Sequence, residues 1–305
     1  MYVELKDINK HFNNYKASDH VSFGIEKGKL IGLLGPSGSG KTTILRMIAG
    51  LEQPDSGEII IDGKVVNDVP ASKRGIGFVF QNYALFRYMT VYDNIAFGLK
   101  VQKVDKKTID KRVKELIELI GLKGLDKRYP SQFSGGQRQR IGIARSLAVH
   151  PKFVVCDEAV SALDVSIQSQ IINLLLDLKE QNNLTYLFIS HDLSVIKYIS
   201  DRIGVMYLGN MMELSDTEHL FAHPYHPYTE ALLSAIPTTD VDGRKETIIL
   251  EGDIPSPINP PKGCKFHTRC RYCTEICKNV TPQFEEVEPG HFVACHHKLG
   301  VPEEK

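Results

Sequence analysis

Gly35-Pro36-Ser37-Gly38-Ser39-Gly40-Lys41-Thr42 is the stretch of sequence that decides the fold. A short apolar run, residues 29–34, enters it and predicts a buried strand. Residues 41–49 have helical character, and Gly50 then stops the helix. A glycine-rich loop between a strand and a helix, ending in Lys-Thr, is typical of a phosphate-binding loop. The sequence therefore predicts an α/β nucleotide-binding domain.

Each polar group of this loop has an expected role. The backbone N–H groups of residues 38–41 cradle the β-phosphate, and the Lys41 ammonium reaches the β and γ oxygens. Thr42 offers its hydroxyl to Mg²⁺, and Thr43 can bind the α-phosphate. The loop therefore predicts a nucleoside triphosphate with Mg²⁺; the family resemblance described below implies that this nucleotide is ATP.

Composition narrows the class of protein. The chain has 305 residues and 42% hydrophobic content, enough for one large domain with an extension or for two domains. Lys plus Arg equals Asp plus Glu at 37 each, so no net charge favours nucleic acid or an anionic membrane. The apolar runs are far shorter than a membrane span, and residues 1–4 do not begin a signal peptide. We expect a cytoplasmic protein that needs partner subunits for any work at a membrane.

A second glycine motif, Ser134-Gly135-Gly136-Gln137, follows much later, within residues 133–140. Breaks at Gly124 and at Tyr129-Pro130 precede it, so we expect a helix to begin here. The side chain of Ser134 and the N–H groups of the two glycines then lie at a helix N-terminus. Orphan N–H donors and the helix dipole favour a γ-phosphate at that position.

Three further apolar runs end in polar residues. Residues 75–80 lead into Gln81, residues 153–156 lead into Asp157 and Glu158, and residues 185–190 lead into His191. Each run predicts a buried strand. Taken singly, the glutamine is unremarkable, the two acids could cap the next helix, and the histidine could be structural.

In this order the motifs resemble those of ATP-binding cassette (ABC) ATPases: phosphate loop, Q-loop, signature motif, Walker B motif, D-loop and switch histidine. The resemblance implies a P-loop NTPase cassette with a RecA-like core, an antiparallel β subdomain and a helical subdomain. We expect the nucleotide-binding domain at residues 1–235, with its helical subdomain at about 82–145. A loop-rich C-terminal extension is expected at residues 236–305.

The resemblance also implies roles for single residues. Gln81 would join the shell of Mg²⁺ and the attacking water through its carbonyl, and Asp157 would hold Mg²⁺ through water. Glu158 would act as general base, and His191 would sense the γ-phosphate and support Glu158. Asp164, in the D-loop Ser161-Ala162-Leu163-Asp164, would contact the opposite subunit.

Adenine usually stacks on an aromatic side chain near the start of such domains. Phe12 matches that position best, and Tyr15 is the alternative. A role for Phe12 in the core of the N-terminal sheet is also open.

Two amphipathic helices are predicted between these motifs. Residues 105–120 carry apolar side chains at helical spacing, and so do residues 166–181, for which we expect a serine cap at Ser166. The first could pack on a permease or could simply be a solvated surface helix.

One phosphate loop and one signature motif of the same chain cannot face the same nucleotide in the known ABC geometry. The resemblance therefore implies two composite sites across a dimer with an identical or related ATPase subunit. It also implies integral-membrane permease subunits as partners, an external solute-binding protein as an indirect partner, and a peripheral location on the cytoplasmic face of the cell membrane.

The subfamily resemblance changes along the chain. Residues from 35 to about 140, including 83–91 and 128–132, look like sulfate and related solute importer ATPases. From about Ile141, segments such as 162–168 and 226–229 resemble oligopeptide and dipeptide permease ATPases. Residues 254–257 and 264–270 look like the C-terminal extension of the latter group.

Five of the six cysteines lie in this tail. In the peptide-importer family the matching Cys264, Cys270, Cys277 and Cys295 are associated with an iron–sulfur cluster. Four thiolates suit either a [4Fe–4S] cluster or a tetrahedral zinc ion, and a third interpretation is that the four thiols bind nothing. A disulfide is disfavoured in a reducing cytosol. Cys273 is extra and could substitute as a ligand, whereas Cys156 belongs to a buried strand.

We therefore expect the ATP-hydrolysing subunit of an ABC importer for oligopeptides or dipeptides. Import of sulfate or another solute is the alternative within this class. A non-transport ABC ATPase acting on nucleic acid or the ribosome is the alternative from another class, and it would need a basic surface or a second cassette. A hybrid that hydrolyses ATP without a cognate transporter is a third possibility.

Overall fold

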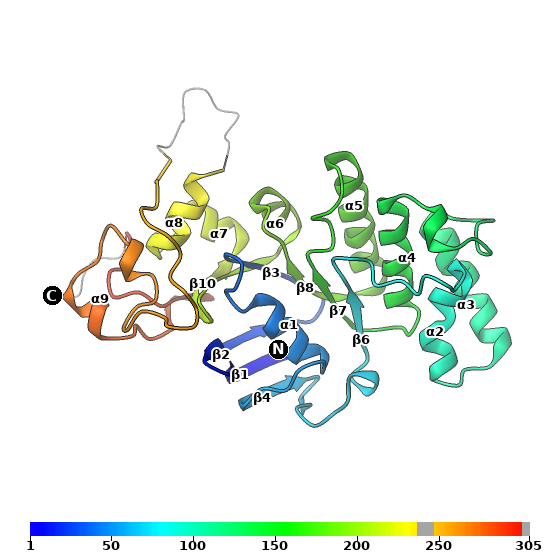
Figure 1. Cartoon of the computed structure of the whole chain (residues 1–305), viewed down its shortest axis with the longest axis horizontal. Coiled ribbons are helices and arrows are strands. Elements are labelled where there is room, and N and C mark those ends of the chain that lie inside the picture. The colour runs from blue at the N-terminus through cyan, green and yellow to red at the C-terminus, as the bar shows by residue number, and fades with distance from the viewer. Residues whose placement is uncertain (237–246, 301–305) are drawn as a thin grey trace.

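The computed structural model describes residues 1–236 and 247–300. The expected C-terminal extension therefore falls partly outside the described residues, at 237–246 and 301–305. Figure 1 shows an elongated arrangement with α2 and α3 at one end, α9 at the other and the sheets between them.

The larger sheet has the strand order β11-β12-β10-β9-β3-β8-β7-β6. Its core, from β9 to β6, is parallel, whereas β10, β12 and β11 are added as antiparallel strands. The strands are β3 (Leu30–Leu34), β6 (Ile76–Val79), β7 (Phe153–Asp157), β8 (Thr185–Ile189), β9 (Arg202–Tyr207), β10 (Asn210–Asp216), β11 (Glu285–Glu288) and β12 (His291–Val293). All residues of β3 and β8 are buried, which is expected for parallel strands covered on both faces.

The smaller sheet is antiparallel, with the order β2-β1-β4-β5. It comprises β1 (Val3–Phe12), β2 (Tyr15–Ile25), β4 (Ser56–Ile61) and β5 (Lys64–Val65). Its apolar side chains, such as Val3, Ile8 and Val21, pack into one core with Ile44 and Ile48. This sheet is the predicted antiparallel β layer.

Nine α-helices are described: α1 (Lys41–Ala49), α2 (Val91–Val101), α3 (Lys106–Leu119), α4 (Gly135–Leu147), α5 (Val165–Asn182), α6 (Leu193–Ile199), α7 (Thr217–Ala222), α8 (Pro227–Ser234) and α9 (Glu275–Asn279). Short 3₁₀ turns lie at Ala71–Lys73, Pro130–Gln132 and His267–Arg269. Figure 1 shows α2, α3 and α4 together beyond β7, as expected of a helical subdomain. Among the described residues, we found no helix with the length and apolar character needed to cross a membrane.

The local predictions agree closely with the observed elements. The helix after the phosphate loop spans the expected residues, and α3 begins after Asp105, whose carboxylate accepts a hydrogen bond from Thr108 N–H at 3.0 Å. One prediction was wrong: Ser166 does not cap the helix that follows it. Asp164 caps α5 instead, because its Oδ1 accepts from Ile167 N–H at 3.0 Å, and Ser166 lies inside the first turn.

The C-terminal segment is packed against the rest of the chain. β12 pairs with β10, so the hairpin β11–β12 extends the large sheet. Phe266 is 1% exposed and stacks edge-on against Tyr207 of β9, with ring centroids 5.5 Å apart. The segment is loop-rich, as expected, but its anchors are a sheet edge and an aromatic cluster.

Candidate nucleotide-binding site

The phosphate loop leaves the carboxyl end of β3 and enters α1. Its glycines are required by close backbone packing: a Cβ on Gly35 would lie 2.2 Å from Met206 O, and one on Gly40 would lie 2.1 Å from Ala17 O. Both also have positive φ, 147° and 97°. Ser37 and Gly38 are exposed at the tip, Pro36 is half-buried and Ser39 is buried. The loop is therefore a rigid cradle with an open tip.

Lys41 lies inside this cradle and is 8% exposed. Its ammonium donates hydrogen bonds to Gly35 O at 2.7 Å, Pro36 O at 2.9 Å and Ser39 Oγ at 3.2 Å. Burial lowers the pKa of Lys41, and the negative charges of Glu158 and Asp157 oppose that shift. The loop thus holds its only lysine where phosphate oxygens are expected.

Thr42, in the first turn of α1, contacts Asp157 at the end of β7. Thr42 Oγ1 donates to Asp157 Oδ1 at 3.0 Å, although the two residues are far apart in sequence. Burial raises the pKa of the Asp157 carboxyl, and the Thr42 hydrogen bond acts in the opposite direction. A hydroxyl beside a carboxylate is the oxygen donor set that Mg²⁺ prefers. Thr43, the next residue, is half-buried.

Glu158 follows in a left-handed conformation, with φ of 48°. This conformation is costly for a non-glycine residue and is often retained at functional sites. Gln81 Nε2 donates to Glu158 Oε2 at 2.9 Å, and His191 Nδ1 lies 3.8 Å from the same oxygen. The structure therefore brings together the polar residues that follow β6, β7 and β8.

The two candidate adenine contacts differ in their surroundings. Phe12 is 41% exposed, so it is not a core residue, and Lys10 Nζ lies 5.1 Å from its ring centroid. Tyr15 OH donates to Gly38 O at 2.7 Å and so braces the tip of the phosphate loop. The ring of Phe12 is therefore exposed to solvent, whereas the hydroxyl of Tyr15 already binds the phosphate loop.

The signature motif forms the start of α4. Ser134 caps the helix, with Oγ accepting from Gln137 N–H at 3.4 Å, while Gln137 Oε1 accepts from Ser134 N–H at 3.1 Å. A Cβ on Gly136 would lie 2.4 Å from Ile167 Cγ2 of α5, and one on Gly135 would lie 2.9 Å from Tyr83 OH. Packing against Ile167 therefore requires a glycine at 136, whereas at 135 the side chain of Tyr83 could shift to make room.

Arg145, near the end of α4, is a residue that sequence reasoning missed. Its guanidinium donates to the carbonyl oxygens of Tyr83 and Ala84, which both have positive φ. The strained segment after Gln81 is thus tied to the signature helix. A half-buried arginine in an amphipathic helix carries no sequence signal for such a contact.

The four predicted cysteine ligands, Cys264, Cys270, Cys277 and Cys295, line one small pocket. Burial and the neighbouring cysteines raise the pKa values of Cys270 and Cys295, to about 11 and about 12. Cys273 is not among the residues that line this pocket.

His226 also lines the cysteine pocket. Its Nδ1 accepts from Tyr228 N–H at 3.0 Å and caps α8. The ring is 1% exposed, and its Nε2 is buried without a hydrogen-bond partner. The sequence did not single out this nitrogen.

Comparison with known proteins decides the family. Residues 18–161 match the model of the family described as "ABC transporter". The oligopeptide transport ATP-binding protein AppF of Bacillus subtilis is 46% identical, with 96% of each chain covered. The chain belongs to the ABC transporter ATP-binding proteins. Residues 212–277 of this ABC protein match the family "Oligopeptide/dipeptide transporter, C-terminal region".

Two further comparisons bear on this ABC protein. The dipeptide transport ATP-binding protein DppF of Haemophilus influenzae is 44% identical, over 92% of this chain and 89% of the relative. A solved ATP-binding cassette, dimeric and bound to ADP and Pi, covers 70% of this chain and 98% of its own, with 31% identity and a TM-score of 0.64. The predicted cassette fold and the likeness of the tail to peptide-transporter subunits are thus confirmed.

Proposed function

We propose that this chain is the ATP-hydrolysing subunit of an ABC importer that takes up oligopeptides or dipeptides. The observation that carries the ATPase assignment is the convergence of Gln81, Glu158 and His191 beside the Thr42–Asp157 pair. In this proposal Asp157 and Thr42 hold Mg²⁺, Glu158 removes a proton from the attacking water, and Gln81 and His191 position that water.

Peptides are favoured as cargo because the likeness to two peptide-transport proteins covers 96% and 92% of this chain. The likeness to sulfate importers rests only on residues from 35 to about 140. The match to the peptide-transporter C-terminal region adds independent support. Sulfate import is therefore the weaker of the two alternatives.

A second ATPase subunit is part of the proposal. The signature motif begins α4, and the phosphate loop precedes α1. These two helices lie on opposite sides of β7 in Figure 1, so the two motifs are well separated within one chain. A dimer would place Ser134 and the N–H groups of Gly135 and Gly136 against the γ-phosphate held by the partner's loop. Asp164 would then lie near that interface, where its capping of α5 fixes the D-loop.

The segment 81–97 is the proposed contact with the permease. Tyr88 is 96% exposed there, and the rings of Phe86 and Phe97 stand 4.5 Å apart. Since Arg145 ties the start of this segment to α4, a movement of the signature helix would be transmitted to the permease. The subunit would work on the cytoplasmic face of the membrane, and the external solute-binding protein would reach it only through the permease.

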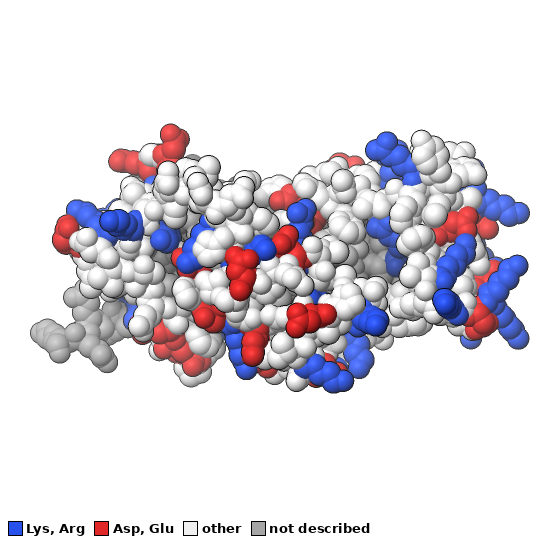
Figure 2. All heavy atoms as spheres, turned by 60° about the horizontal axis from the view of Figure 1, so that its bottom comes forward, with Lys and Arg blue, Asp and Glu red and all other residues white. Residues whose placement is uncertain are grey.

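The surface charge does not favour the nucleic-acid alternative. Figure 2 shows Lys and Arg side chains gathered at the end of the molecule that carries α2 and α3, with Asp and Glu side chains between them. Nucleic-acid affinity depends on unopposed cations along a phosphate backbone. The mixed charges fit a solvated subdomain better.

We propose an iron–sulfur cluster, rather than zinc, as the group that the cysteine pocket would hold. Tetrahedral zinc requires thiolate sulfurs about 3.8 Å apart, from Zn–S bonds of about 2.3 Å. In the described part of the chain, the three groups that come close enough for one ion are His219, Glu288 and His291, not cysteines. A [4Fe–4S] cluster spaces its thiolates more widely, because each binds a different iron. The buried Nε2–H of His226 would supply a hydrogen bond to a cluster sulfur.

Such a cluster would supply a one-electron redox centre or a rigid cross-link within the extension. We keep the boundary of that extension near residue 236 as part of the proposal. The nucleotide site and the cysteine pocket then belong to separate parts of the subunit.

Photo-crosslinking in membranes tests the transport proposal. Crosslinkers at exposed Tyr88, and at exposed Glu180 of α5 as the control, are followed by mass-spectrometric identification of the captured proteins. We expect a permease at Tyr88 but not at Glu180, and peptide-dependent ATP hydrolysis when that permease is reconstituted. Capture of a sulfate-type permease alone would refute the peptide assignment.

A further inference from the structure

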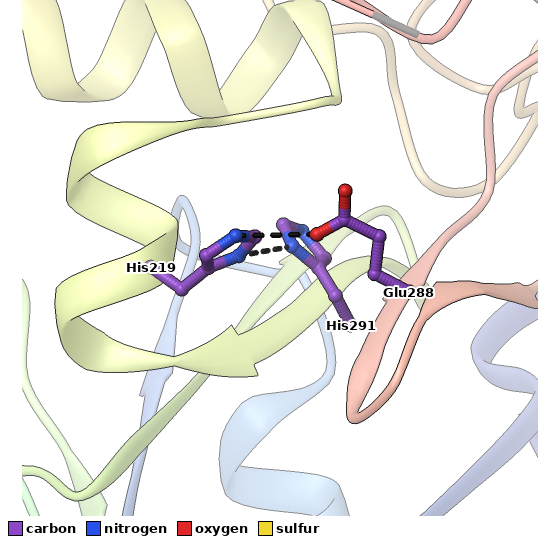
Figure 3. Close-up of side chains that lie close together, drawn as sticks. All are labelled: His219, Glu288 and His291. Atoms are coloured by element: carbon purple, nitrogen blue, oxygen red, sulfur yellow. Dashed lines mark hydrogen bonds and ion pairs between the residues drawn. The ribbon is translucent and has the colours of Figure 1, made fainter.

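Three side chains from two separate parts of the chain converge on one point. His219 projects from α7. Glu288 is the last residue of β11 and His291 is the first residue of β12, so both lie beside the turn of this hairpin (Figure 3). One ligand atom from each lies within 4.8 Å of the others. The group is distinct from both the nucleotide site and the cysteine pocket.

The orientation of His291 is fixed by a buried carboxylate. Glu213 is fully buried, and its Oε1 lies 2.7 Å from His291 Nε2. The same carboxylate accepts from the N–H groups of Tyr225 and His226, at 2.7 and 3.0 Å. An ionised acceptor of this kind places the proton of His291 on Nε2. The lone pair of His291 Nδ1 is therefore directed away from Glu213.

That lone pair faces a second imidazole. His219 Nδ1 lies 2.9 Å from His291 Nδ1, and His219 Nε2 lies 3.2 Å from Glu288 Oε2. If His219 donates its Nε2–H to Glu288, two Nδ1 lone pairs face each other. Two neutral imidazoles cannot satisfy this arrangement, but a cation bound to both lone pairs can.

The surrounding charge also favours a cation. Glu213 and Glu288 contribute two carboxylates, and Tyr225 OH donates to Glu288 Oε1 at 2.7 Å. Burial and the two carboxylates raise the pKa of Tyr225 to about 12, so it remains a neutral donor. Among the described residues, the nearby Arg202 is engaged elsewhere, with Gly290 O and Asp216.

We propose that His219 Nδ1 and His291 Nδ1 bind a divalent transition-metal ion, with Glu288 and Glu213 as the carboxylates that orient the two imidazoles. Two imidazoles suit Zn²⁺, and water would take the remaining positions. The hydrogen bond from a ligating imidazole to a carboxylate is the usual outer contact of such sites. A bound ion needs the two nitrogens about 3.3 Å apart, so the rings must separate by a few tenths of an ångström.

The proposed ion would join two elements that are remote in sequence. His219 belongs to a helix that follows β10, whereas His291 and the carboxylate of Glu288 belong to the added edge of the large sheet. The ion would therefore fasten the hairpin β11–β12 to α7. Stabilisation of the folded chain by the metal is the expected consequence.

Cobalt titration of the full-length chain tests the site, with Co²⁺ as an optical probe for the Zn²⁺ position. Thiolate ligands give an intense charge-transfer band, whereas imidazole and carboxylate ligands do not, so the cysteine pocket can be told apart. We expect the wild-type chain to bind one Co²⁺ without that band and Zn²⁺ to displace it. His219→Ala and the isosteric Glu288→Gln should weaken binding at least tenfold.

His223→Ala is the matched control, because this ring lies 5.5 Å from His219 but is not in the ligand set. It should leave the Co²⁺ spectrum unchanged, and Zn²⁺ should raise the melting temperature of this control but not of His219→Ala. Equal binding by the wild type and both variants would overturn the proposal. So would the absence of Co²⁺ binding by the wild-type chain.

Discussion

The nucleotide site and the cysteine pocket are assembled in different ways. At the nucleotide site, Gln81, Glu158 and His191 each follow a parallel strand, and adjacent strands bring their ends to one edge of the sheet. In the cysteine pocket, loops and one short helix supply the cysteines, and aromatic packing on Tyr207 holds this segment against the sheet. Regular secondary structure places the first set, whereas tertiary packing places the second.

The largest expected effect concerns Glu158. Glu158→Gln removes the general base but keeps the side-chain volume, so ATP hydrolysis should fall by about 10²–10⁴-fold. ATP binding should persist, and dimers should accumulate with ATP. Steady-state phosphate release and size-exclusion chromatography measure both, with Glu180→Gln on the exposed face of α5 as the control. Near-normal hydrolysis would remove Glu158 as the base.

The second prediction tests the other region. Cys295→Ser should abolish cluster binding because Cys295 lines the pocket, whereas Cys273→Ser should retain it. Iron and acid-labile sulfide per chain, after anaerobic reconstitution, provide the measurement. Equal loss in both variants would mean that Cys273 is a ligand and that the proposed set is wrong.

The third prediction separates packing from phosphate binding in the signature motif. Gly136→Ala should lower the free energy of unfolding by about 1–3 kcal/mol, because its Cβ would overlap Ile167. Gly142→Ala, in the same helix, places its Cβ 3.5 Å from Tyr83 O and should be tolerated. Urea unfolding of the isolated subunit distinguishes them. If the two variants are equally stable, Gly136 is not required by packing.

The smallest effect is expected at His226. His226→Asn keeps a side-chain acceptor for the cap of α8 but removes the Nε2–H donor from the cysteine pocket. A hydrogen bond to a cluster sulfur stabilises the reduced, more negative state, so its loss should lower the reduction potential. Redox titration followed by electron paramagnetic resonance measures the potential. An unchanged potential would show that His226 Nε2 does not contact the cluster.

Sequence reasoning succeeded where function lies close to a strand or helix end. Lys41, Asp157 and Glu158 follow or enter regular elements, and the structure brings their side chains close together, while their roles stay a proposal. It failed for Ser166, because two polar residues near one helix start compete as caps and only the backbone geometry selects Asp164. It also missed Arg145, whose partners are carbonyl groups that no sequence pattern marks.

The sequence by itself determined the strands and helices next to the motifs, the phosphate loop, the signature motif and the cysteine-bearing tail. Short-range signals suffice for these features, because glycine loops, caps and apolar periodicity act within a few residues. Tertiary structure alone decided that Phe12 is exposed and that His226 faces the cysteines. It also brought His219 to Glu288 and His291. Contacts between distant segments depend on how whole elements pack, which no local pattern encodes.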